Sequence, residues 1–161
     1  MTDPVPARYR TSEQARRIGL IASSFERLVG RPLVEMRETG PEPGHGPDDI
    51  VSALWHAPRA IVAHGTQDDP LFFFGNRCAL GAFDYDVAGF VGTPSRFSAE
   101  APLREERQAL LDRVSRDGYI DDYSGIRITS AGRRFRIGPA IVWNILDEQG
   151  VRYGQAATFM P

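Results

Sequence analysis

The most informative pattern of hydrophobic and polar positions runs from residue 60 to residue 97. Two dense apolar runs are separated by a Q-D-D-P turn, which predicts two short strands at 60–63 and 71–74. Asn76 follows them and is placed to cap a helix, because its side chain can accept from the N–H groups of a first helical turn. A second short helix is predicted within 84–94, where glycine and proline end it.

An amphipathic helix is predicted before this stretch. Thr11 is followed three residues later by Gln14, which is a capping-box pattern, and apolar side chains then recur at helical spacing through 12–29. The G-R-P sequence at 30–32 ends the helix. Its apolar side either covers one face of the domain or serves as a dimerisation or signalling surface. Residues 1–11 have no periodicity and are predicted to be a flexible arm.

The second half of the chain predicts one longer helix, at 102–116, and then strands only. Glycines and prolines at 37–47 predict a linker, and a short helix follows it at 48–55. The last segments alternate or are densely apolar, and they predict strands at 119–129, 133–137, 140–146 and 151–159. In the first of them, Ile126 and Ile128 alternate with Arg127 and Thr129. The predicted organisation is an arm at 1–11, a helix and linker at 12–47, and a main domain at 48–161.

Composition limits the classes of function. The chain has 161 residues and a formal net charge of −2, and all its 19 basic residues are Arg, which is typical of a high-GC bacterial genome. This mild acidity gives no reason to expect nucleic-acid binding. No apolar run is long enough for a membrane span, and the N-terminus has no secretory h-region. A single cysteine, Cys78, excludes an internal disulfide, so the sequence is typical of a cytoplasmic protein.

The order of elements resembles that of PAS domains. F-F-F-G-N-R-C-A-L-G-A-F-D-Y-D-V-A-G-F-V-G-T-P-S is similar to the strand–Asn–helix segment of that fold, and V-W-N-I-L-D-E-Q-G-V-R-Y-G is similar to its last hairpin. More narrowly, P-S-R-F-S-A-E, R-E-E-R, G-Y-I-D-D-Y-S-G-I-R-I-T-S-A-G-R-R-F-R-I and W-N-I-L-D-E-Q-G resemble the MEKHLA domain. The resemblance covers roughly residues 14–160.

The resemblance implies an α+β, PAS-like fold. We expect a five-stranded antiparallel sheet with helices packed on one face, plus the N-terminal amphipathic helix. The space between sheet and helices would be the ligand pocket. The family resembles sensory or interaction modules, and it supplies no catalytic residues to carry across.

Light sensing through a flavin adduct is excluded by one residue. Y-D-V-A-G-F-V-G-T-P-S-R-F is similar to the segment of light-sensing LOV domains that carries the reactive cysteine, but Ser95 stands at that position. A hydroxyl, with a pKa far above that of a thiol, cannot form the flavin–sulfur bond. Non-covalent flavin or haem binding stays open, although the region where PAS haem histidines normally lie contains no histidine.

The titratable residues suggest structural roles. His64 lies in a turn, where a hydrogen bond is expected, with a ligand-binding role as the alternative. A lone cysteine is usually a small buried hydrophobe, so Cys78 is not expected to be reactive. His45, His56, His64 and Cys78 are not spaced to supply a tetrahedral metal site, and no metal is predicted. The sequence also lacks nucleophile and phosphate-loop signatures, so we expect no enzyme.

Large side chains with polar tips are the better pocket candidates. Aromatic walls with a few convergent polar groups are typical of small-molecule sites. The predicted ligand-binding residues are Phe72, Phe74, Arg96, Tyr123, Trp143, Asn144, Gln155 and His64.

Three functions remain open at this point. The first is a sensory module that binds a small molecule or cofactor and signals through a homodimer or a protein partner. The second is a ligand-free interaction or dimerisation module, and the third is a small acid–base enzyme. Fold class alone does not decide among them.

Overall fold

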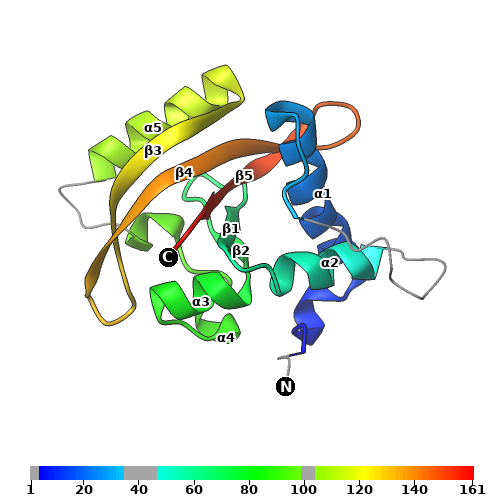
Figure 1. Cartoon of the computed structure of the whole chain (residues 1–161), viewed down its shortest axis with the longest axis horizontal. Coiled ribbons are helices and arrows are strands. Elements are labelled where there is room, and N and C mark those ends of the chain that lie inside the picture. The colour runs from blue at the N-terminus through cyan, green and yellow to red at the C-terminus, as the bar shows by residue number, and fades with distance from the viewer. Residues whose placement is uncertain (1–3, 35–46, 99–103) are drawn as a thin grey trace.

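The computed structural model describes residues 4–34, 47–98 and 104–161 and has an α+β fold. Five antiparallel strands form one sheet in the order β2-β1-β5-β4-β3 (Figure 1). The strands are β1 (Ala60–His64), β2 (Phe72–Gly75), β3 (Tyr119–Ile128), β4 (Arg134–Leu146) and β5 (Arg152–Phe159). The segments predicted at 133–137 and 140–146 are one strand, β4, that continues across Gly138-Pro139. Most of the predicted linker at 37–47 lies outside the described residues.

Helices cover both faces of the sheet. The helical elements are η1 (Ala7–Tyr9), α1 (Ser12–Val29), α2 (Pro47–Trp55), α3 (Arg77–Phe83), α4 (Val87–Phe90), η2 (Ser95–Ser98) and α5 (Arg104–Asp117). In α1 the Thr11 side chain accepts from the Gln14 N–H, as the capping box predicts, and Gly30 ends the helix in the left-handed conformation with φ +89°. The predicted fold with helices on one face and an additional N-terminal helix is thus confirmed, and that helix covers the second face.

The face that carries Trp143 packs against the N-terminal helices. Trp143 Nε1 donates to the Ile21 carbonyl at 3.0 Å, and its ring meets Phe25 edge-on with ring centroids 4.8 Å apart. Because the apolar side of α1 is buried here, it is part of the core of its own chain. We call this face of the sheet the α1 face.

The N-terminal segment is packed rather than free. Residues 1–11 were predicted as an arm, but Tyr9 is buried between Trp55 and Phe74. Its hydroxyl accepts from the Gly75 N–H and donates to the Gly75 carbonyl, both at 3.2 Å. An aromatic side chain with a satisfied hydroxyl anchors a segment that has no periodicity of its own, which corrects the prediction for residues 4–11.

Asn76 joins the elements at the centre of the fold. Its Oδ1 accepts from the Ile61 and Ala79 N–H groups, so it caps α3 as predicted, and its Nδ2 donates to the carbonyls of Leu54 and Arg59. All four distances lie between 2.8 and 3.0 Å. One buried amide therefore fixes α2, β1 and α3 relative to one another.

Candidate functional site

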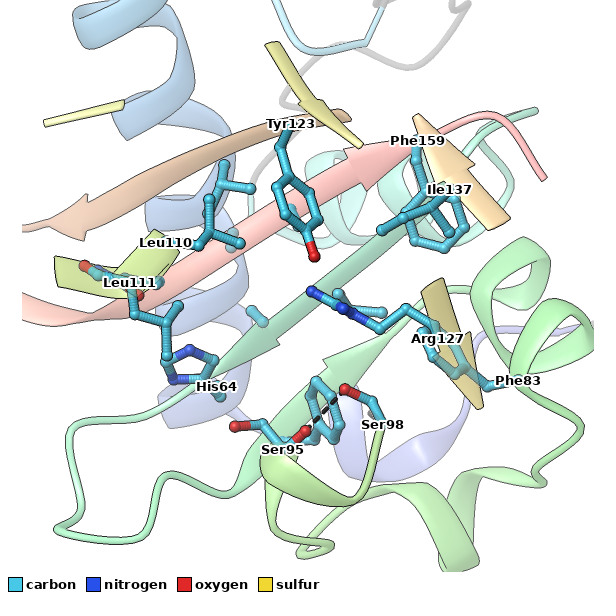
Figure 2. A pocket seen from close by; sticks show the side chains of 17 residues that line it. His64, Phe83, Ser95, Ser98, Leu110, Leu111, Tyr123, Arg127, Ile137 and Phe159 are labelled. Carbon is cyan, nitrogen blue, oxygen red and sulfur yellow. Dashed lines mark hydrogen bonds between the residues drawn. The ribbon is translucent and has the colours of Figure 1, made fainter. Parts of the chain in front are cut away.

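A cavity lies between the sheet and the helices on the face opposite α1. We call this the cavity face. Strand pairing places His64 beside Gln155, and Val62 beside Ala157, and all four residues line the cavity. Residues of α3, η2 and α5 complete the wall (Figure 2). The lining consists of Val62, Ala63, His64, Phe72, Phe83, Ser95, Ser98, Leu110, Leu111, Tyr123, Arg127, Ile137, Val142, Gln155, Ala156, Ala157 and Phe159.

The β4 interruption shapes this wall. Ile137 and Val142 are an odd number of residues apart, yet both line the cavity. Strict alternation would send them to opposite faces. Gly138, with φ +142°, lies between them, where β4 has one extra residue between its pairs Ile137–Gly125 and Ala140–Tyr123 and the alternation is broken. Without this break, one end of β4 would turn its apolar side chains away from the cavity.

The cavity is small. Its volume is about 60 Å³. The tricyclic ring of a flavin or the macrocycle of a haem is several times larger. The cavity therefore fits neither cofactor, and Ser95 lines it at the position where the LOV-like segment would need a cysteine.

Gln155 is held by α5. Its Nε2 donates to the Leu111 carbonyl at 3.3 Å, to Ser115 Oγ at 3.2 Å and to Asn144 Oδ1 at 3.1 Å. Asn144 in turn donates to the Val114 carbonyl at 3.0 Å. The two amides thus attach α5 to the middle of the sheet and define one end of the cavity.

At two glycines near the site, a neighbouring group lies closer than a side chain would allow. At Gly125 a Cβ would overlap the Tyr123 hydroxyl, so the absence of a side chain lets the phenol fold back over β3. At Gly154, with φ +153°, a Cβ would overlap the His64 carbonyl, so β5 runs unusually close to the end of β1. This approach places His64 and Gln155 in one wall.

The predicted site residues lie in three places. His64, Phe72, Tyr123 and Gln155 line the cavity, and Asn144 is bonded to Gln155. Phe74 and Trp143 contact Tyr9 and Phe25 on the α1 face, so they are not part of the cavity wall. Arg96 is half-exposed and its Nε donates to the Asp69 carboxylate at 3.1 Å on the surface. A ligand-binding role for these residues stays a prediction.

Sequence reasoning missed Arg127 as a site residue. The alternation of Ile126 and Ile128 with arginine and threonine normally places the isoleucines inside. The structure reverses it, because Arg127 and Thr129 are buried whereas Ile126 is 38 % exposed. Leu110, Leu111 and Ser98 were missed as well, because their part in the wall depends on how α5 and η2 dock.

The other titratable candidates lie apart from the cavity or have structural partners. His64 Nδ1 lies 2.9 Å from the Gly65 carbonyl, so it carries the proton and donates, in keeping with the predicted turn role. Burial raises the pKa of the Cys78 thiol, and the nearby Arg77 only partly offsets this, which disfavours the reactive thiolate. Among the described residues, no group of three or more His, Cys, Asp and Glu side chains could hold a metal ion. In the described ranges, no helix is both long and apolar enough to span a bilayer.

Comparisons with solved structures define the class of protein as PAS-like. The chain is similar to a PAS domain of a protein from Colwellia psychrerythraea, with 15% identity and a TM-score of 0.61, over 70% of this chain and 92% of that one. It is also similar to a structure of the fungal photoreceptor VVD, with 16% identity and a TM-score of 0.51, over 64% of this chain and 76% of that one. At these identities the likeness shows the fold alone.

The family is shown by sequence. The MEKHLA domain model matches residues 15–161, and the chain belongs to this family. Because the match begins at residue 15, it includes α1 except for the first three residues of that helix. A homeobox-leucine zipper protein HOX10 of Oryza sativa subsp. indica is 21% identical over 63% of this chain, and ATHB-15 of Arabidopsis thaliana is 22% identical over 80%. The matched regions make up 12% and 15% of those two proteins.

Proposed function

We propose that this MEKHLA domain is a non-enzymatic sensory module that binds a small organic molecule in the cavity between β5, β4 and α5. The observation that carries the proposal is the cavity itself, whose largely apolar wall contains a few convergent polar groups. Among the described residues, its lining includes no carboxyl group, and general acid–base catalysis usually relies on a carboxyl or an imidazole with a tuned pKa. His64 is in the wall, but its Nδ1 proton is committed to a backbone carbonyl.

Strand β4 supports a route for the signal. Val142 and Asn144 face the cavity side and α5, while Trp143 between them packs on α1. A ligand that binds more tightly to one position of β4 would therefore shift the equilibrium between two packing arrangements of α1. The size of this shift is limited by the difference in the ligand's binding free energy for the two arrangements. The receiver of the signal would be a second copy or a protein partner.

The small volume of the cavity favours a second candidate, a ligand-free interaction module. The matched relatives carry this region as a small part of much longer proteins, which suits a domain that acts through its neighbours. In that case Val142, Leu110 and Ala157 would simply be the edge of an imperfectly filled core.

Native mass spectrometry of the freshly purified full chain separates the two candidates. The sensory proposal expects a fraction of the protein to carry an extra mass that is lost on denaturation. A single species at the mass of the bare polypeptide, unchanged after incubation with extracts of small metabolites, would favour the interaction module.

A further inference from the structure

The pairing of β3 with β4 places Arg127 on the cavity face of the sheet. Arg127 is paired with Phe135, whose ring meets Phe83 of α3, whereas Ile126 is paired with the exposed Arg136. Between the pairs Ile120–Val142 and Tyr123–Ala140, β3 has one extra residue, which brings Tyr123 to the cavity face. Arg127, four residues further on, lies on the same face by ordinary alternation. The arginine is only 8 % exposed.

The guanidinium has no anionic partner in the described part of the chain. One of its N–H groups donates to the Ile126 carbonyl at 3.1 Å, and Cζ lies 5.1 Å from the centre of the Tyr123 ring. Figure 2 shows its nitrogens extending into the cavity beside the Tyr123 hydroxyl. A buried charge without a counter-charge is costly, so this group favours an anion in the space that it faces.

A second buried group in the wall also requires a partner. Gln155 is 1% exposed, and its Oε1 accepts no hydrogen bond from any described residue. Its Nε2 is occupied by α5 and Asn144, so Oε1 is the polar atom of this lining side chain that has no partner among the described residues. An unpaired buried carbonyl favours a donor on the ligand.

We propose that the cavity binds a small organic carboxylate, with Arg127 paired to the carboxylate and a hydroxyl or N–H of the ligand donating to Gln155 Oε1. This inference rests on the proposed function and names its ligand class. A planar carboxylate matches the fork of an arginine in two parallel hydrogen bonds. Leu110, Val142 and Phe159 would contact the apolar body of the ligand, which inorganic phosphate lacks.

Calorimetric titration of the full chain with matched probes tests the proposal. The probes are lactate, butyrate, lactamide and inorganic phosphate, each up to millimolar concentration. We expect lactate to bind more tightly than butyrate, because only lactate donates to Gln155, and lactamide and phosphate to bind at least tenfold more weakly. Arg127→Gln should weaken lactate binding about tenfold or more, since hydrogen bonds to charged groups are worth roughly 1.5–3 kcal/mol. Arg136→Gln, on the exposed side of the same strand pair, is the matched control and should leave binding unchanged.

Three other results would contradict the proposal. Equal affinity for lactate and lactamide in the unchanged protein overturns the carboxylate inference but leaves a small-molecule site in place. No binding of any probe also overturns it, and the native mass measurement then decides the proposed function separately. If Arg127→Gln does not fold, Arg127→Lys keeps the charge and loses the fork, and undiminished lactate binding to that variant would contradict the paired geometry.

Discussion

Asn76 shows how one side chain can determine the geometry of several elements. The two ends of its amide serve four backbone groups that are otherwise buried away from water. Sequence reasoning predicted the cap of α3, because capping depends on a local pattern. The two bonds from Nδ2 join positions 17 and 22 residues away and follow only from the tertiary fold.

Asn76→Ala should lower the free energy of unfolding by about 3 kcal/mol, because four hydrogen bonds are lost and their backbone partners stay buried. Denaturant unfolding followed by circular dichroism measures the change. Thr11→Ala, which removes one exposed cap, is the control and should cost only about 1 kcal/mol. Equal effects of the two substitutions would contradict the central role of Asn76.

Tyr9 makes stability depend on pH in the alkaline range. Burial raises its pKa from 10.0 to about 12, against smaller opposing effects of the Gly75 backbone and Arg8. Between these two values the folded state keeps a proton that the unfolded state has lost, so stability falls as pH rises through the window. The decrease is at most about 1.4 kcal/mol per pH unit. Tyr9→Phe should flatten this slope in unfolding experiments across the window, and an unchanged slope would contradict the assignment.

Secondary structure was more predictable than the positions of side chains. The boundaries of α1, β1 and β2 follow from caps, turns and apolar runs that lie next to each other in sequence. The reversal at Arg127 could not be predicted, because the extra residue in β3 between Ile120 and Tyr123 changes which face the following residues occupy. Trp143 and Phe74 were assigned to the pocket because they are large, but size does not indicate which face of a sheet carries the cavity.

Because α1 packs against the sheet of its own chain, its removal should disrupt the fold. A helix that served only as a dimer contact could be deleted without loss of the fold. Because Trp143 and Ile145 of β4 are completely buried, and Trp143 contacts α1 directly, deletion of residues 1–30 should abolish the cooperative thermal transition and expose apolar surface to a hydrophobic dye. An intact transition in the truncated chain would contradict this packing. The homodimer stays a prediction, and it would have to use another surface while α1 is packed.

For the molecule as a whole, the two covered faces of the sheet share their strands, because alternate side chains of one strand point to opposite faces. Under the proposed function, a ligand on the cavity face and the packing of α1 on the other face would both act on β4. The predicted arrangement of a sensor thus fits within one chain without a separate output domain among the described residues.

A cavity-filling substitution isolates the cavity from the rest of the fold. Ala157 lines it and is paired with Val62 and Val142, so Ala157→Leu would place an isopropyl group in the open space. The variant should unfold at the same temperature as the unchanged protein or slightly above it, because the added group buries apolar surface without displacing a neighbour. A large loss of stability would show that the space is closed to additional atoms.

Native mass spectrometry of the two freshly purified chains side by side shows whether the cavity holds a ligand. We expect a bound small molecule on the unchanged protein and none on Ala157→Leu. The same extra mass on both chains, or on neither, would contradict a ligand site between β5, β4 and α5.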